Sequence, residues 1–319
     1  MNEEQSALAY GRAYALFSEV YRQGLREASA RILGVDYDNS QDGASHYQLF
    51  VHNVFPYESI FLGNDGLLGG VVTERVVTFY ERIGFQADSS DSADHISNEL
   101  SALAHLCFAE HDAIVNDLVH EVQRLRQLQR RFLDEHLLRW LATFWLAVQQ
   151  QEQSVYTAIV QQSFELVCRH REALGDDLMA QDKLFILPRS PDVIDDEKTS
   201  LRDIARYLLT PAYTGFYLSS DDIKRIGTRL RLPHGFGKRQ QILTNLLRTA
   251  SDYELFPETI AVFKASALDW HTQLESLAGL PVAIQQVWLA RLDETLAVLN
   301  HIEQMARHAM DDPYNENTR

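Results

Sequence analysis

Apolar side chains recur at three- and four-residue steps along most of the chain, which is the periodicity of an amphipathic helix. In the first segment this stripe consists of Leu8, Ala9, Ala13, Leu16, Phe17, Val20, Tyr21 and Leu25. The alternation of period two that indicates a half-buried strand does not occur. The pattern therefore predicts an all-α protein.

Residues 94–174 give the longest uninterrupted helical pattern, because they contain no proline and no glycine. A single helix rising ~1.5 Å per residue would be implausibly long, so we expect two or three antiparallel helices. Asp94 is the predicted N-cap, since its carboxylate can accept hydrogen bonds from the free amides of a first turn. The nearly apolar run Leu137–Val148 is shorter than the ~20 residues of a bilayer span and contains Arg139, so it predicts a buried helix.

The composition changes after residue 175, where acidic pairs and two prolines replace the helical pattern. This change predicts a linker over residues 176–200 that separates a first helical domain, 1–175, from an additional helical section, 201–310. Residues 311–319 are predicted to be a frayed tail. In the second section we expect helices at Leu201–Leu209, Ser220–Leu230, Lys238–Ala250, Pro257–Leu277 and Pro281–Ala309.

The chain has a net charge of −16, from 45 acidic and 29 basic side chains. This balance argues against a protein that binds duplex nucleic acid, since such a protein needs cations to replace the counterions of the phosphates. It also argues against docking on, or insertion into, an anionic membrane. It favours a cationic partner, such as an Arg-rich peptide.

The expected location is the cytoplasm. The chain starts with the acidic sequence Met1–Glu4 and has no apolar segment typical of a secretory signal. Cys107 and Cys168 are too few for a disulfide framework, and they lack the CxxC spacing of redox and metal sites. Each lies in a helical pattern, where a free cysteine usually behaves as a small core residue.

Motifs typical of enzymes are absent from the sequence, which contains no GxGxxG, GxxxxGK[ST], HExxH or GxSxG. We therefore expect no enzymatic activity, no cofactor and no metal. His95 and Glu99 stand four residues apart, and Glu110, His111 and Asp112 are adjacent. Neither group has a recognised ligand spacing with partners elsewhere, so hydrogen-bonded helix histidines are favoured over a zinc or di-iron site.

One segment, residues 219–243, is basic and contains Lys224, Arg225, Arg229, Arg231, His234, Lys238 and Arg239. Its glycine-containing turn leads into a predicted helix start, where free amides favour an anion. His234, Lys238 and Arg239 are the candidate anion-binding residues, for a nucleotide, a pterin phosphate or an acidic protein surface. The simpler interpretation, a solvated basic face, is favoured over a binding site.

Four short motifs occur in order in the first half of the chain. They are PYES at Pro56–Ser59, an aromatic–glycine helix end at Tyr80–Phe85, an Asp-His pair opening a Leu-rich helix at Asp94–Leu100, and EHLLRW at Glu135–Trp140. Their order and spacing resemble the TorD family of cytoplasmic redox-enzyme maturation chaperones, which includes the DmsD-like proteins. The resemblance covers about Leu8 to Leu174.

The resemblance implies a TorD-like helical bundle with an additional C-terminal helical section. It implies a molecular chaperone, without catalytic activity, that supports cofactor insertion and export proofreading. Its partners would be a twin-arginine signal peptide and the apo form of an exported, molybdopterin-dependent oxidoreductase subunit, and it could form a homodimer. The chain departs from the family where Ser92-Ala93 replace a Glu-Pro motif before the Asp-His pair. Because proline fixes its own backbone angle, we expect this loop to be less rigid.

A twin-arginine peptide combines two guanidinium groups with an apolar stretch, so a matching groove needs apolar walls and a carboxylate rim. The candidate peptide-binding residues are Tyr57, Glu58, Phe61, Asp94, His95, Glu135, His136 and Trp140. For the aromatic residues, a place in the core is an equally good interpretation. Two alternatives to a chaperone are a nucleotide- or cofactor-handling protein that uses the basic turn at residues 234–239, and a helical scaffold.

Overall fold

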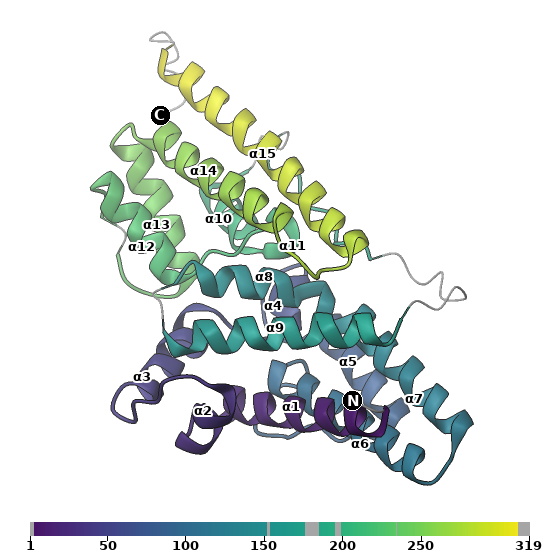
Figure 1. Ribbon diagram of the computed structural model, residues 1–319. Helices are drawn as coiled ribbons and strands as arrows, with labels where there is room; N and C mark the ends of the chain where they lie inside the picture. The colour runs from purple at the N-terminus through teal and green to yellow at the C-terminus, as the bar shows by residue number, and fades with distance from the viewer. Residues whose placement is uncertain (1–2, 152–153, 176–184, 195–198, 234, 312–319) are drawn as a thin grey trace. The chain divides into compact units, whose positions relative to one another are not determined.

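The computed structural model describes residues 3–151, 154–175, 185–194, 199–233 and 235–311. Every regular element among them is a helix, which confirms the predicted fold class (Figure 1). The chain forms two compact units, Met1–Gly63 with Leu67–Phe185, and Asn64–Gly66 with Ile186–Arg319. Residues 176–184 and 195–198 of the predicted linker, His234 of the predicted anion site and 312–319 of the predicted tail lie outside the described residues.

The first unit consists of nine α-helices and two π-helices within the described residues. They are α1 (Glu3–Gln23), α2 (Glu27–Leu33), α3 (Asp42–His46), the π-helix η1 (Tyr47–Asn53), α4 (Glu58–Leu62), α5 (Val71–Ile83), α6 (Ile96–Val115), α7 (Val119–Phe132), the π-helix η2 (Leu133–Leu137), α8 (Leu138–Gln149) and α9 (Val155–Ala173).

The stretch predicted to hold two or three helices contains three helical runs. The first is α6, the second passes without a break through α7, η2 and α8, and the third is α9. The apolar run within the second is buried, since every residue from Trp140 to Val148 is buried between its neighbours α4 and α9. Among the described helices, none has the length and apolar character needed to cross a bilayer.

Helix α1 lies along α6 and reaches α9 through its aromatic side chains (Figure 1). The hydroxyl of Tyr14 lies 2.9 Å from Nδ1 of His170, and the hydroxyl of Tyr21 lies 2.8 Å from Oγ of Ser163. All four residues are buried. Burial lowers the pKa of His170 to about 3, so the ring is neutral and accepts the Tyr14 proton.

The second unit has its own helices and its own core. The helices are α10 (Leu201–Leu209), α11 (Pro211–Thr214), α12 (Ser220–Leu230), α13 (Arg239–Asp252), α14 (Phe256–Glu275) and α15 (Val282–Asp311). Apart from the short α11, each matches a predicted helix to within two residues. Figure 1 shows α14 and α15 side by side. Phe263 of α14 and Trp288 of α15 are buried.

The turn after α11 brings the backbone close to α15. Gly215 has a φ of +76°, and a Cβ atom added there would lie 2.8 Å from Cγ of Leu292. A side chain at this position would be strained by both the backbone angle and the contact. Glycine therefore allows the close approach of the two elements.

Candidate functional site

Two of the four sequence motifs meet as a short antiparallel clamp. The amide of Glu58 donates to the carbonyl of Asp94 at 3.0 Å, and the amide of Ile96 donates to the carbonyl of Pro56 at 2.9 Å. Tyr57 and His95 form an isolated β-bridge at the centre. The clamp holds the start of α4 against the start of α6.

Asp94 caps α4 and not α6, so the sequence prediction for this residue was wrong. Its Oδ2 accepts the amide of Ser59 at 2.9 Å, in the first turn of α4. The N-cap of α6 is His95, whose Nδ1 accepts the amide of Ser97 at 3.2 Å. The prediction failed because the clamp places Asp94 beside a helix start that is 35 residues away in sequence.

Tyr57 and His95 share a carboxylate at the partly exposed edge of the clamp. The Tyr57 hydroxyl donates to Oδ1 of Asp91 at 2.7 Å, and Nε2 of His95 lies 3.7 Å from Oδ2 of the same residue. Burial outweighs this neighbouring charge and lowers the pKa of His95 to about 4. His95 is therefore neutral near pH 7, where its Nδ1 acts as the helix cap.

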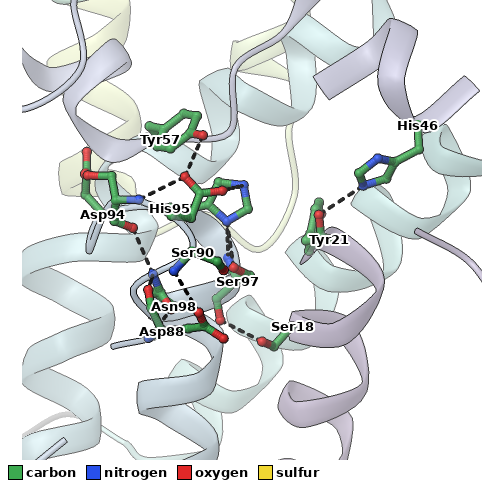
Figure 2. Close-up of polar contacts among 12 residues, drawn as sticks. Ser18, Tyr21, His46, Tyr57, Asp88, Ser90, Asp94, His95, Ser97 and Asn98 are labelled. Atoms are coloured by element: carbon green, nitrogen blue, oxygen red, sulfur yellow. Dashed lines mark hydrogen bonds and ion pairs between the residues drawn. The ribbon is translucent and has the colours of Figure 1, made fainter. Parts of the chain in front are cut away.

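The loop in which Ser92 and Ala93 replace the family's Glu-Pro motif is held by hydrogen bonds. The carbonyl of Ser92 accepts from the His95 amide at 3.0 Å and from Nδ2 of Asn98 at 2.9 Å. The carbonyl of Ala93 accepts the Tyr80 hydroxyl at 2.9 Å. Figure 2 shows His95, Ser97 and Asn98 together, with the Ser18 hydroxyl of α1 donating to the carbonyl of Ser97 at 2.7 Å. These bonds restrain the loop in place of a proline ring.

Beneath the clamp lies a group of buried polar side chains from three motifs. Glu58 is 1% exposed, and its Oε2 lies 2.9 Å from Nδ1 of His136 in η2. Glu99 is fully buried, and its Oε2 accepts the indole N–H of Trp140 at 3.3 Å. We call Glu58, Asp94, Glu99, His136 and Trp140 the buried junction.

The predicted peptide-binding residues separate into two classes. Phe61 is fully buried and stacks on Trp140 with ring centroids 5.5 Å apart, so it is part of the core around the junction. Glu135 lies apart from the junction, and its Oε1 accepts Nε of Arg131 at 2.9 Å at the partly exposed side of η2. Tyr57 is also partly exposed, whereas the other predicted residues are buried.

Sequence reasoning missed the role of Glu99 and Tyr80, although both belong to the quoted motifs. Burial, followed by the carboxylates of Glu99, Glu58 and Asp94, raises the pKa of Tyr80. The only signal in the sequence was that Glu99 stands on the apolar side of its helical pattern, where a charged residue needs a partner.

The candidate anion site in the second unit is occupied in part by the protein itself. The guanidinium of Arg239 donates to the carbonyls of Leu218 and Leu209 at 3.2 and 3.3 Å and lies 4.7 Å from the Tyr217 ring centroid. Lys238 is exposed at the N-cap of α13. Arg239 thus serves to hold the second unit together.

The described residues contain no cluster of three or more His, Cys, Asp or Glu side chains arranged to hold a metal ion. Cys107 and Cys168 are free and buried, as the sequence predicted. Burial raises the pKa of the Cys168 thiol to about 12, which keeps it protonated and unreactive. The described residues define an all-helical protein.

Comparison with known proteins shows which family this chain resembles. Residues 8–145 match the family model described as nitrate reductase delta subunit. This match agrees with the resemblance to TorD-like redox-enzyme assembly chaperones that was inferred from the motifs.

Three curated relatives support this assignment. The chain is 34% identical over 117 residues to the selenate reductase assembly chaperone protein of Thauera selenatis and 32% identical over 116 residues to the chlorate reductase assembly chaperone protein of Ideonella dechloratans, each match covering 36% of this chain and 56% of the relative. It is 28% identical over 96 residues to the chaperone protein TorD of Vibrio atlanticus (strain LGP32), covering 29% of this chain and 43% of that protein. The chain thus spans about half the length of these relatives, all named as chaperones.

Proposed function

We propose that the chain is a cytoplasmic assembly chaperone for an exported, molybdopterin-dependent reductase. The observation that carries the proposal is the family match over residues 8–145, the part of the chain that contains the buried junction. Two of its relatives are named as assembly chaperones of reductases. Under this proposal the chain binds the apo form of the catalytic subunit until its cofactor is inserted, and only then releases it for export.

The proposed ligand on the client is its twin-arginine leader peptide. Such a leader carries two guanidinium groups, which the net charge of −16 attracts. The attraction steers the encounter, while the apolar part of the leader supplies most of the binding free energy. Arginine is favoured over lysine wherever a carboxylate is bound by two parallel hydrogen bonds.

Some of the candidate residues would contact the peptide, and others would hold the surrounding helices in place. Tyr57 and Glu135 are the partly exposed candidates and would touch the peptide. Asp94, His95 and His136 are buried, so they would act by holding the start of α4, the start of α6 and η2 in place. The ion pair of Glu135 with Arg131 would be exchanged for one with an arginine of the leader.

Co-expression with a candidate reductase subunit tests the proposal. We expect the tagged chain to retain the subunit, and to retain less of it when the two leader arginines are changed to lysines. Tyr57→Ala should weaken this capture, whereas Tyr47→Ala, a matched change at a 56% exposed tyrosine in η1, should not. Equal capture of the arginine and lysine leaders would refute the leader-binding part. Failure of the wild-type chain to retain the subunit would refute the chaperone role.

A further inference from the structure

Two carboxyl groups in the interior of the first unit lie close enough to interact with each other. Glu58 comes from α4 and Glu99 from α6, and both are at most 1% exposed. Oε2 of Glu58 contacts Nδ1 of His136 in η2. Oε2 of Glu99 accepts the indole N–H of Trp140 in α8. The remaining oxygen of each, Oε1, is shielded from solvent and receives no hydrogen bond from any other described residue.

The charges that act on Glu99 are negative, those of Glu58 and Asp94. The titratable and charged groups that act on this pair are Asp94 from the clamp, Tyr80 of α5, His136 of η2 and Arg139 of α8. Arg139 interacts with Glu135 as well as with Glu58, and it interacts more strongly with Glu135. Nδ1 of His136 lies 2.9 Å from Oε2 of Glu58, whereas the partner of Glu99 is the uncharged indole of Trp140.

Two ionised carboxylates cannot stably occupy this position. They would be two acceptors with no donor between them, and like charges in a medium of low polarity repel strongly. One proton resolves the conflict, because it removes one charge and turns Glu99 into a donor to Glu58. We propose that Glu58 and Glu99 form a carboxylic acid–carboxylate pair that shares one proton, and that this proton ties α4 to α6.

The pair makes the first unit sensitive to alkaline pH. Burial first, and then the charges of Glu58 and Asp94, raise the pKa of Glu99 well above its ordinary value of 4.5. The unfolded chain therefore releases this proton near pH 4.5, while the folded chain retains it to higher pH. Between the two pKa values the equilibrium constant for unfolding rises about tenfold for each pH unit. The stabilisation is complete below pH 4.5 and is lost as the pH rises through the folded pKa.

Infrared spectroscopy of the full-length chain detects the proton directly. At about pH 6.5, well above the pKa of an ordinary glutamate, we expect the C=O stretch of a neutral carboxylic acid in the wild-type protein. Glu99→Gln should remove the band, because the amide replaces the acid and donates permanently to Glu58. Glu58→Gln should remove it as well, because the amide can donate to an ionised Glu99 and the charge of Glu58, the second cause of the raised pKa after burial, is gone.

Glu110→Gln is the matched control. Glu110 lies on the same helix and is also buried, but it has a cationic partner, with its Oε1 2.6 Å from Nε of Arg126. This variant should keep the infrared band. Absence of the band from the wild-type protein at about pH 6.5 would overturn the proposal. Persistence of the band in Glu58→Gln would show an isolated neutral glutamate and would overturn the sharing.

A second measurement follows the same proton through stability. The equilibrium constant for unfolding, measured by urea titration from about pH 7 to 9, should rise more steeply with pH in the wild-type protein than in Glu99→Gln. Histidines no longer titrate there in the unfolded chain, and all other groups are common to both proteins. Identical slopes would contradict the proposal, and if Glu99→Gln does not fold, the wild-type infrared band still decides.

Discussion

Replacing Asp94 by alanine tests whether the clamp depends on a cap supplied from a distant segment. The carboxylate accepts the Ser59 amide at 2.9 Å and also the hydroxyl of Ser92, and it is fully buried. Alanine leaves the buried Ser59 amide without an acceptor, which costs about 1–3 kcal/mol. Removing an N-cap usually costs about 0.5–2 kcal/mol. This figure refers to the same hydrogen bond, so the two costs are not summed.

One effect opposes this loss. Asp94 contributes to the negative potential at Glu99, so removing its charge relieves repulsion within the buried junction. We therefore expect Asp94→Ala to lower the free energy of unfolding by about 1–2 kcal/mol, in the lower part of the range for an unsatisfied buried amide. Asp94→Asn keeps an oxygen acceptor and also loses the charge, so it should cost less than about 1 kcal/mol.

The assay is urea unfolding of the full-length chain near pH 7, followed by circular dichroism. Asp36→Ala, a change at an exposed aspartate of a turn, is the control and should stay within about 0.5 kcal/mol of wild type. If Asp94→Ala is as stable as this control, the trans cap contributes nothing and the reasoning is refuted. If Asp94→Asn is as unstable as Asp94→Ala, the charge matters and not the acceptor.

Three further changes probe other parts of the fold. Arg239→Lys should lower the free energy of unfolding by about 1–2 kcal/mol, because lysine cannot serve two carbonyls and a ring together; a thermal-shift measurement that finds no loss would contradict a structural role for this side chain. Gly215→Ala should cost more than Gly84→Ala by about 1–3 kcal/mol in urea unfolding, because both sites have positive φ but only the first is crowded; equal losses would contradict the close approach. The pKa of His170, lowered to about 3 by burial, makes the folded protein lose about 1.4 kcal/mol per pH unit below pH 6.5. His170→Gln, which keeps an acceptor for Tyr14, should reduce this acid sensitivity, and unchanged acid unfolding would contradict the assignment.

Helix positions in this chain could be predicted from the sequence because they depend on local pattern. The limits of α10 and α12 follow from an apolar stripe and from the capping residues Ser200 and Ser219. The π-helices η1 and η2 could not be predicted in this way. Each lies inside an apparently regular helical pattern, and the extra residue in its turn is stabilised by tertiary contacts such as that of His136 with Glu58.

Four of the five residues of the buried junction, Glu58, Asp94, His136 and Trp140, were candidates from the sequence. Glu99 was not a candidate, and the arrangement of the five was not predicted. Their burial could not be predicted, because it depends on which segments meet across 35 to 78 residues of sequence. A carboxylate in a motif was therefore interpreted as part of a charged rim, although Glu58 lies in the interior.

The burial of the motifs changes what a family resemblance of this kind says about recognition. Motif residues that hold α4, α6 and η2 together are constrained by the architecture, since breaking a buried hydrogen bond costs more than losing an exposed contact. Residues that discriminate between clients are under no such constraint and belong on the surface around the junction. Tyr57 and Glu135 are motif residues that also reach solvent. Substitutions at these two positions should therefore alter client binding with little loss of stability, while substitutions at Asp94 or Glu99 should alter stability first.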